Sequence, residues 1–315
     1  MKSEIITMGS INQDVFVNIN DFPEYGETLW ANSISSQPGG KGANQAITLA
    51  KLSNNVTFIS AIGNDNYGEK VLEFIKLSGV EIQNITIKEE IGTGLFIVIL
   101  DKNGENTMIG TLGANNHLSV KDVKKGFKNT KATYFLLQLE TSISSIKTAL
   151  QICDKKGIKV VLDPAPVDGI KEDFIQYADI ITPNQKEAQV ISGIKVKDTC
   201  SAKKAAKIIH EKGANTVILK LGNKGSLIYD NNNFTFVDAY NVKTINTVGA
   251  GDVFVAALTS YISSENNIVE SVMYATAAAA IKVSKLETQK SIPTHDEIVE
   301  FRNNYNLKNK NGPSF

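Results

Sequence analysis

The sequence is poor in cysteine, in net charge and in long apolar runs. Of its 315 residues only Cys153 and Cys200 are cysteines, so neither a zinc knuckle nor a disulfide framework can be built from the chain. Lys plus Arg and Asp plus Glu number 33 each, which removes any bulk electrostatic attraction to nucleic acid or to an anionic membrane. We therefore expect neither of these as a partner.

No stretch of the chain is long and apolar enough to predict a membrane span or a signal peptide. The apolar run ATAAAAIKV is interrupted by Lys282, and polar residues soon follow the first short apolar run. With so few cysteines, a reducing cytoplasm is the expected location. The length suits one large α/β domain, or a main domain with a small accessory one.

Short apolar runs alternate with helical patterns through most of the chain. The runs are apolar at nearly every position, as in strands covered on both faces. This alternation predicts an α/β fold in three layers, with a mostly parallel sheet between two layers of helices. The expected strands are 4–9, 56–63, 133–140, 159–166, 179–184 and 215–222, and the expected helices are 42–53, 66–78, 142–156, 184–192 and 198–212. From Ala250 onward the chain reads as helical.

Two regions interrupt this alternation and predict a small antiparallel sheet outside the main one. The first holds the strand-like runs 14–20 and 28–36, and the second is a hairpin over 92–113 that turns at Lys102-Asn103-Gly104. The run GLFIVIL has no polar face, so we expect a lid that covers a ligand with one face and pairs with a second subunit through the other. An edge extension of the main sheet is the alternative.

The stretch NTVGAGDVF (246–254) combines a glycine turn with an acid at the start of a helix. Gly249 and Gly251 allow backbone N–H groups to approach a ligand, and the helix N-terminus adds further unpaired N–H groups. A carboxylate would repel a bound phosphate there, unless Asp252 takes a proton from a hydroxyl that attacks the phosphate. The alternative is a glycine turn with an acid that only favours the helix start.

Two further motifs each have a functional and a structural interpretation. PGGKGANQA (38–46) is neither a Walker loop nor a dinucleotide fingerprint, but Lys41 and Asn44 at a helix start suit a polyhydroxylated ligand; a plain loop is the alternative. In ITPNQKEA (181–188), Asn184 and Glu187 share a helix face and suit the water shell of Mg²⁺. From these residues alone, a helix cap is the favoured interpretation of that pair.

Polar residues end two of the predicted strands. Asn12 and Asp14 follow the first strand, and Glu140 ends the strand TYFLLQLE. The carboxyl ends of strands in such a sheet face the ligand crevice, so these residues are candidates for ligand contacts. Ordinary loop positions are the alternative for each.

In order, GSINQD, PGGKGANQA, LQLE, TPNQKEA, LKLGNKGS and NTVGAGDVF resemble the ribokinase branch of the PfkB-type carbohydrate kinases, from about residue 5 to residue 295. The resemblance implies a single kinase domain over residues 1–315, with lid strands inserted at about 14–37 and 92–112. It also implies a homodimer joined through the lids and the transfer of the ATP γ-phosphate to the 5-hydroxyl of ribose.

By matching positions, the resemblance also implies the residues of the site, including a role near Mg²⁺ for the pair first interpreted as a cap. Asp252 would be the catalytic base, and the N–H groups of Gly249, Ala250 and Gly251 would form an anion hole. The implied sugar contacts are Asn12, Asp14, Gly40, Lys41, Asn44, Glu140 and Asp252. The implied nucleotide contacts are Asn184, Lys220, Gly222, Gly225, Gly251 and Thr276, and Asn184 and Glu187 would hold Mg²⁺ through water.

The chain departs from the family pattern at the implied monovalent-cation site. The resemblance implies a site near Asn246, Val248 and Ser291, but Asn246 stands where an Asp is usual and Glu287 where a glycine is expected. The loss of the charge and the added bulk leave K⁺ activation an open question.

Three functions remain to be compared. A ribokinase is the leading hypothesis. A phosphorylated sugar would need further basic residues, and GSINQD and GGKGANQ offer only Lys41, which favours an unphosphorylated sugar. A kinase of the same fold for another sugar or a nucleoside is the alternative, with Phe16 and Trp30 as an apolar shelf for a nucleoside base. A non-catalytic sugar-binding regulator is disfavoured by the intact GAGD.

Overall fold

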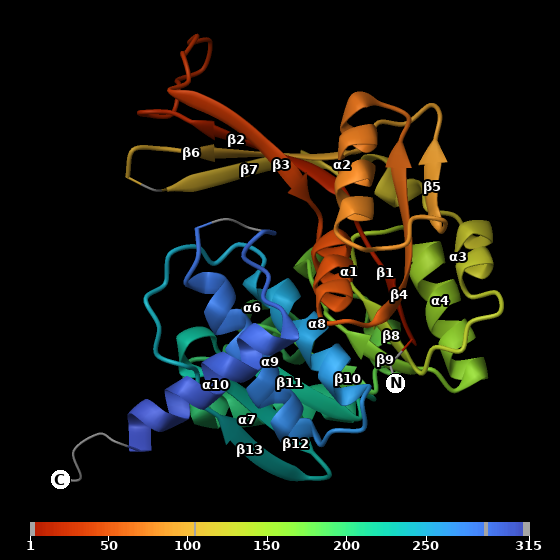
Figure 1. Ribbon diagram of the computed structural model, residues 1–315, viewed down its shortest axis with the longest axis vertical. Coiled ribbons are helices and arrows are strands. Elements are labelled where there is room, and N and C mark those ends of the chain that lie inside the picture. The colour runs from red at the N-terminus through yellow and green to blue at the C-terminus, as the bar shows by residue number, and fades with distance from the viewer. Residues whose placement is uncertain (1–3, 104, 287–288, 311–315) are drawn as a thin grey trace.

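In this computed structural model, one large sheet carries helices on both faces, and a small sheet projects from one end (Figure 1). The structure describes residues 4–103, 105–286 and 289–310, with residue 106 and the last five described by their backbone. The helices are α1 (Lys41–Lys51), α2 (Asn66–Leu77), α3 (Val120–Gly126), α4 (Ile143–Lys156), α5 (Glu172–Ile175), α6 (Gln185–Ser192), α7 (Thr199–Glu211), α8 (Ala250–Ile262), α9 (Ile268–Val283) and α10 (His295–Lys310).

The large sheet has the strand order β13-β12-β11-β10-β9-β8-β1-β4-β5. Its strands are β1 (Glu4–Met8), β4 (Asn55–Gly63), β5 (Ile85–Lys88), β8 (Tyr134–Leu137), β9 (Lys159–Leu162), β10 (Ile180–Ile181), β11 (Thr216–Lys220), β12 (Ser226–Asp230) and β13 (Asn233–Val237). Neighbours from β5 through β11 pair in parallel, and β12 and β13 add an antiparallel edge. The expected mostly parallel sheet is confirmed, and the antiparallel edge is an addition to it.

Side-chain alternation along the strands divides the core into two layers. On β1, Ile6 and Met8 face the layer that contains α3, α4, α5, α6 and α7. Ile5 faces the opposite layer, which contains α1, α2, α8, α9 and α10. Most positions of the central strands are therefore apolar, whichever face of the sheet they point to, which explains the near-continuous apolar runs in the sequence. The three-layer arrangement is confirmed.

The small sheet is separate from the large one, with the order β3-β2-β6-β7. Its strands are β2 (Asn12–Asn18), β3 (Ser33–Gly39), β6 (Gly94–Leu100) and β7 (Asn106–Thr111). The outer pairs are antiparallel, whereas β2 and β6 pair in parallel at the centre. Of the run 28–36, only the residues from Ser33 onward form a strand, and Gly104 of the expected hairpin turn lies outside the described residues.

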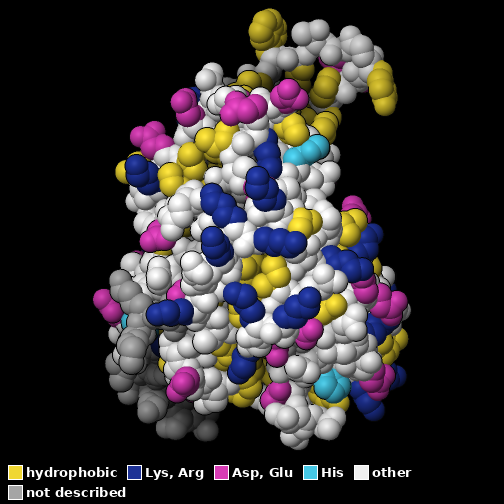
Figure 2. Space-filling view, turned by 90° about the vertical axis from the view of Figure 1, so that its right-hand side faces the viewer, with side chains coloured by type: hydrophobic (Ala, Val, Ile, Leu, Met, Phe, Trp, Pro, Cys, Tyr) yellow, Lys and Arg dark blue, Asp and Glu magenta, His cyan; other side chains and the backbone are white. Residues whose placement is uncertain are grey.

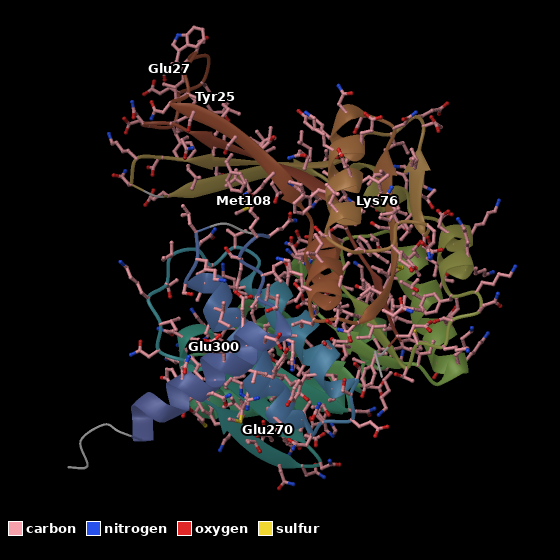
Figure 3. The ribbon with its side chains drawn as sticks, in the orientation of Figure 1. Tyr25, Glu27, Lys76, Met108, Glu270 and Glu300 are labelled. Carbon is pink, nitrogen blue, oxygen red and sulfur yellow. The ribbon has the colours of Figure 1, made fainter. Side chains whose placement is uncertain are left out.

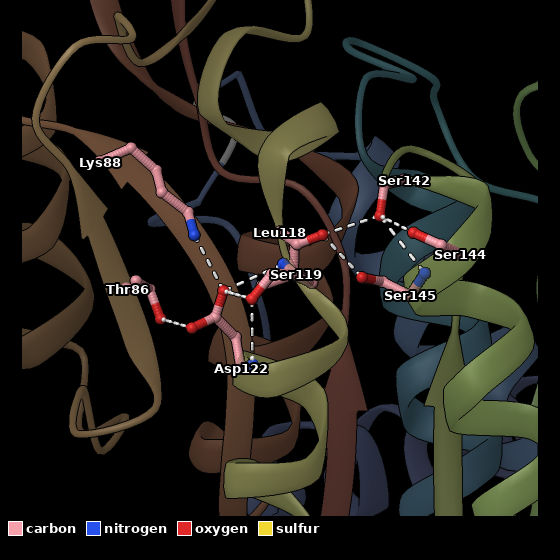
Figure 4. A network of polar contacts seen from close by, with 8 residues as sticks. All are labelled: Thr86, Lys88, Leu118, Ser119, Asp122, Ser142, Ser144 and Ser145. Carbon is pink, nitrogen blue, oxygen red and sulfur yellow. Dashed lines mark hydrogen bonds and ion pairs between the residues drawn. The ribbon is translucent and has the colours of Figure 1, made fainter.

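A polar network fastens β5 to α3 and α4 (Figure 4). Asp122 accepts hydrogen bonds from Thr86 at 3.0 Å and Lys88 at 2.9 Å, and it closes a capping box with Ser119. Burial alone would raise the pKa of Asp122, but the hydrogen bonds from Ser119 and Lys88 outweigh burial and lower it to about 2. The Leu118 carbonyl accepts hydrogen bonds from two serines at the start of α4. This network lies away from the cleft described below.

Two surface features complete the description. Figure 2 shows hydrophobic side chains on the projecting end of the molecule, above a body on which Lys and Arg side chains gather over the middle and Asp and Glu side chains lie mostly nearer the edges. Among the described residues, no helix is both long and apolar enough to cross a membrane.

Candidate active site

The cleft between the small sheet and the body forms a cavity of about 800 Å³. Its polar wall lies at the carboxyl end of the parallel strands, and its roof is the inner face of the small sheet. Figure 3 shows Met108 on the side of the small sheet that faces the body, whereas Tyr25 and Glu27 lie at its far tip. The sequence-derived candidates that line the cavity are Asn12, Asp14, Gly40, Lys41, Asn44, Glu140, Asn246, Val248, Gly249 and Asp252.

The glycine turn before α8 adopts the conformation that an anion cradle needs. Gly249 has φ +74°, in the left-handed region that favours glycine, and helix α8 begins at Ala250. The Ala250 N–H donates to the Thr247 carbonyl at 3.2 Å. A Cβ built on Gly251 would lie 3.9 Å from Lys220 Nζ. The start of α8 therefore combines first-turn N–H groups with a nearby ammonium, which together favour a bound anion.

Asp252 lies in the first turn of α8 and is only 8% exposed. Its carboxylate accepts a hydrogen bond of 2.9 Å from Asn44 Nδ2 on α1. Burial raises the pKa of Asp252 to about 6, with Lys41 opposing the rise and Asp163 adding to it. A carboxylate with this pKa is ionised at neutral pH and can accept a proton, as a general base must.

The sugar-side candidates form a second group of interacting charges. Lys41 Nζ lies 3.3 Å from Glu140, and Ser10 Oγ donates to the same carboxylate at 2.5 Å. Burial and the Glu140 charge raise the pKa of Asp14 to about 6. Burial alone would lower the pKa of Lys41, but Glu140 and Asp252 outweigh burial and raise it. Together with Asp252, the group thus offers three carboxylates and one ammonium to hydroxyl groups.

Gly40 brings α1 close to the end of β1. Its φ is +95°, and a Cβ built there would lie 2.6 Å from the Ser10 carbonyl oxygen. Only glycine fits both the backbone angle and the space, which is a structural reason for the glycine at this position.

Asp163, at the carboxyl end of β9, was not singled out from the sequence. It is 2% exposed, and its carboxylate contacts Lys220 Nζ at 3.0 Å and accepts a hydrogen bond from Gln45 Nε2 at 3.1 Å. The Gln45 carbonyl oxygen in turn accepts from Gln138 at 2.5 Å. The position of Asp163 at the end of a strand, like that of Glu140, was the signal that the sequence offered.

Asn115 is a second buried residue that the sequence reading missed. Its side-chain amide exchanges hydrogen bonds with the Ile11 backbone at 2.8 and 2.9 Å and donates to Asn12 Oδ1 at 2.8 Å. Asn115 therefore fixes the start of β2, and with it the Asn12 side chain, at the cavity wall.

Asn184 and Glu187 form the helix cap that their spacing indicates. The Asn184 side chain caps α6, and the Glu187 carboxylate accepts from the Asn184 N–H at 2.7 Å and from its Nδ2 at 2.6 Å. Burial raises the pKa of Glu187, and the nearby Lys220 opposes that rise. The pair lies beside the Lys220–Asp163 ion pair, since Asn184 bridges to Lys220 on β11.

The remaining nucleotide candidates occupy two places. Gly222 and Gly225 lie in the turn between β11 and β12, with φ +64° and +94°. Thr276 is buried on α9, where its hydroxyl donates to the carbonyl of Val272 at 2.7 Å.

At the implied monovalent-cation site, the Asn246 side chain is already hydrogen-bonded to neighbouring main-chain groups. Asn246 Nδ2 donates to the Leu286 carbonyl at 2.7 Å, and Asn246 Oδ1 accepts from the Val248 N–H at 2.9 Å. The side chain therefore carries no negative charge at this point, and its carbonyl oxygen already accepts one hydrogen bond. Ser291 is buried, and Glu287 lies outside the described residues. Whether K⁺ binds here stays a prediction to be tested.

Comparison with known proteins agrees with this geometry. The pfkB family carbohydrate kinase model matches residues 2–295. The chain belongs to the pfkB family of carbohydrate kinases. It is 36% identical to a ribokinase of Haemophilus influenzae over 302 residues, which cover 96% of this chain and 99% of the relative.

Two solved structures extend the pfkB comparison to three dimensions. A ribokinase from Thermotoga maritima has a TM-score of 0.85 and 35% identity, covering 95% of this chain and 99% of that one. A ribokinase from Arabidopsis thaliana, in complex with ribose and ATP, has a TM-score of 0.88 and 28% identity, covering 96% and 99%. The resemblance drawn from the sequence motifs is thereby confirmed.

Proposed function

We propose that this chain is an ATP-dependent sugar kinase that transfers the γ-phosphoryl group of ATP to the 5-hydroxyl of D-ribose, giving ribose 5-phosphate. The observation that carries the proposal is the buried Asp252 at the start of α8, beside the glycine turn and in a cavity lined by carboxylates and amides. The ribokinase relatives, one of them bound to ribose and ATP, support the choice of sugar. We assign residues 1–315 to one kinase domain, with the small sheet inserted as a lid.

In this mechanism the sugar hydroxyl oxygen forms a bond to the γ-phosphorus while the bond from that phosphorus to the ADP oxygen breaks. The Asp252 carboxylate takes the hydroxyl proton. N–H groups of Gly249, Ala250 and Gly251 stabilise the negative charge on the transferring group, for which the Ala250 N–H exchanges the Thr247 carbonyl for the phosphoryl oxygen. Lys220 lies close to this cradle. Catalysis then rests on positioning and charge stabilisation, as is usual in phosphoryl transfer.

The charges of the cavity favour an unphosphorylated sugar. Lys41 is the one Lys or Arg among the described residues that line the cavity, and Glu140 already pairs with it at 3.3 Å. A second phosphate would meet Asp14, Glu140 and Asp252 instead of free cations. The proposed sugar contacts are Asn12, Asp14, Gly40, Lys41, Asn44, Glu140 and Asp252.

A nucleoside is the second candidate substrate, because the roof of the cavity is apolar. Phe16 and Phe96 on the lid line the cavity and suit a nucleobase. Trp30, the other side chain expected to form such a shelf, is 89% exposed and is not among the lining residues.

We assign the nucleotide to the turn between β11 and β12 and to the start of α8, with Asn184, Lys220, Gly222, Gly225, Gly251 and Thr276 as its contacts. Mg²⁺ would screen the phosphate charge there. A carboxylate has about four lone-pair sites, of which Asn184 uses two on Glu187. The remaining two can accept hydrogen bonds from the waters of a hydrated Mg²⁺. Among the described residues, no three acidic, His or Cys side chains cluster as direct metal ligands.

The outer face of the lid supports a homodimer. Cross-strand register places Ile34, Val17 and Ile99 in one row, and Val15, Ile97 and Ile109 in the next, on the face opposite the cavity. Ile34 is 68% exposed and Ile109 is 64% exposed. A second lid would cover these rows, and Ile34→Asp with Ile109→Asp should then yield a monomer in sedimentation velocity.

The activity is tested by ADP release from MgATP with D-ribose, beside 2-deoxyribose, fructose, fructose phosphates and adenosine, with and without K⁺. Turnover of D-ribose well above the others, with ribose 5-phosphate as product, supports the proposal. Turnover of adenosine alone would assign the Phe16–Phe96 roof to a nucleobase. Turnover of none of the acceptors would overturn the proposal.

A further inference from the structure

Asn44 stands between Asp252 and a residue far away in the sequence, Gln289. Asn44 Nδ2 donates to Asp252 at 2.9 Å, while Asn44 Oδ1 accepts from Gln289 Nε2 at 3.0 Å. All three side chains are at most 8% exposed. The two ends of the Asn44 amide therefore have different partners, one an acceptor and the other a donor.

The orientation of the Asn44 amide determines whether the Asp252 carboxylate faces a hydrogen-bond donor or a carbonyl oxygen. With Nδ2 toward Asp252, the carboxylate gains a donor; rotated by 180°, the amide would present its carbonyl oxygen and repel the carboxylate. In the structure Gln289 directs its Nε2 donor at the Asn44 oxygen, and in this arrangement it favours the first orientation. The contact thus favours one of the two orientations of the Asn44 amide, which have nearly the same shape.

Lys51 holds Gln289 in place. Lys51 Nζ, at the end of α1, donates to the main-chain carbonyls of Gln289 at 3.3 Å and Ile292 at 3.2 Å. Asn44 lies two turns earlier on the same helix. Helix α1 therefore carries both the amide that contacts Asp252 and the ammonium that anchors the residue orienting that amide.

We propose that Gln289 is a positioning residue for phosphoryl transfer, because its side-chain amide holds Asn44 with Nδ2 toward Asp252. The inference rests on the proposed function, in which Asp252 is the base. It adds a residue that contacts neither the cavity nor, in the proposed mechanism, the sugar and nucleotide. Its role is exerted wholly through Asn44.

Other charged groups also act on Asp252. Lys41 from α1, Asp14 from β2, Glu140 after β8 and Asp163 after β9 all influence it. None of these changes when Gln289 is replaced by an uncharged side chain, so a shift in the titration of Asp252 reports on the Asn44 contact.

The test compares Gln289→Met, which removes the donor, with Gln289→Glu, which replaces the donor by an acceptor of the same size. We expect kcat to fall about 10-fold in Gln289→Met and further in Gln289→Glu, as for the loss of a hydrogen bond to a charged group, with the KM for ATP unchanged. The acid limb of the pH profile should move to higher pH in both. The same changes at Gln151, exposed on α4, serve as controls and should leave both quantities as in the wild type.

A double-mutant cycle separates positioning from a general structural role. In an Asn44→Ala background, Gln289→Met should have no further effect on kcat or on the pH profile. An equal loss in both backgrounds, or a wild-type kcat and pH profile in Gln289→Glu, would overturn the inference.

A second readout does not depend on turnover. The pKa of Asp252, followed by carboxyl ¹³C NMR and assigned with Asp252→Asn, should rise in Gln289→Met and stay unchanged by that substitution in the Asn44→Ala background. If the wild type phosphorylates no acceptor, the proposed function fails, whereas this titration still decides whether Gln289 orients Asn44 toward Asp252. An unchanged Asp252 titration in Gln289→Met overturns the inference even in an active enzyme.

Discussion

Lys220 Nζ lies 3.0 Å from Asp163 Oδ1, and this ion pair joins the carboxyl ends of β11 and β9 beneath the start of α8. Asp163 is 2% exposed, so its charge is compensated mainly by Lys220 and by the amide of Gln45. The pair links the floor of the proposed phosphate site to the centre of the sheet. Its two members should therefore be coupled in stability.

Lys220→Met should destabilise the protein by about 3 kcal/mol, since it leaves a buried carboxylate without its cation. Adding Asp163→Asn should restore more than half of this loss, because the uncompensated charge is gone. Urea unfolding measures both. Lys102→Met, which breaks an exposed ion pair with Asp21, is the control and should change little. A double variant no more stable than Lys220→Met would contradict the coupling.

Asp252→Asn should reduce kcat by a factor of about 10² to 10⁴, the usual contribution of a general base. Sugar binding, measured by calorimetry, should persist because Asn keeps the size of the side chain. Wild-type turnover in this variant would remove Asp252 from the mechanism, whereas Asp154→Asn, exposed on α4, should leave turnover unchanged.

The same variant should also be more stable than the wild type at pH 8. A raised pKa means that ionisation of Asp252 costs folding free energy as pH rises from the unfolded-state pKa through about 6. A rise of two pKa units corresponds to a cost of about 3 kcal/mol in folding free energy. The Asp252→Asn variant avoids this cost because Asn does not ionise. The difference from wild type should shrink as the pH falls toward 4, and thermal unfolding across this range measures it.

The pH dependence of kcat/KM should reflect the titration of two carboxyl groups. Asp252 and Asp14 both have a pKa raised to about 6, so activity should fall below pH 6 as the two take up protons. With both required in the ionised form, the limiting slope of log kcat/KM against pH approaches two. Asp14→Asn should reduce this slope to one, with a lower overall rate, and an unchanged slope would assign the second proton elsewhere.

The fold was predictable because most strands of a sheet buried on both faces are apolar at nearly every position. The edge strands β12 and β13 were not predicted, because their apolar runs are only a few residues long and flank the polar stretch DNNN (230–233). The parallel pairing of β2 with β6 was also beyond reach, since a strand's amino acids do not reveal which neighbour it meets or in which direction.

The candidate site was predictable where a motif is local and not where contacts are distant. Gly249 to Asp252 form one turn, so their chemistry can be read from adjacent letters. Gln289 and Asn44 are 245 residues apart, and nothing in KLETQKSIP marks its glutamine as special. The place of Asp163 at a strand end could have been noticed, but its pairing with Lys220 could not, because Lys220 comes from another strand.

Lys282 provides a prediction that does not depend on the reaction. It is 0% exposed on α9, and its ammonium has no hydrogen-bond partner in the part of the chain that the structure describes. Burial lowers its pKa, because an unpaired charge is costly to remove from water.

Lys282→Met keeps the length of the apolar stem and should raise the free energy of unfolding by about 1–3 kcal/mol at pH 7. Because the folded-state pKa is below the unfolded value, the gain is full below the folded pKa and shrinks as pH rises toward the unfolded value. Urea unfolding at pH 7 and pH 10 measures this trend. Lys207→Met, at an exposed position on α7, should change stability by less than about 0.5 kcal/mol. A loss of stability in Lys282→Met would mean that the ammonium has a stabilising partner, and a gain that is equal at both pH values would rule out titration of Lys282 as its cause.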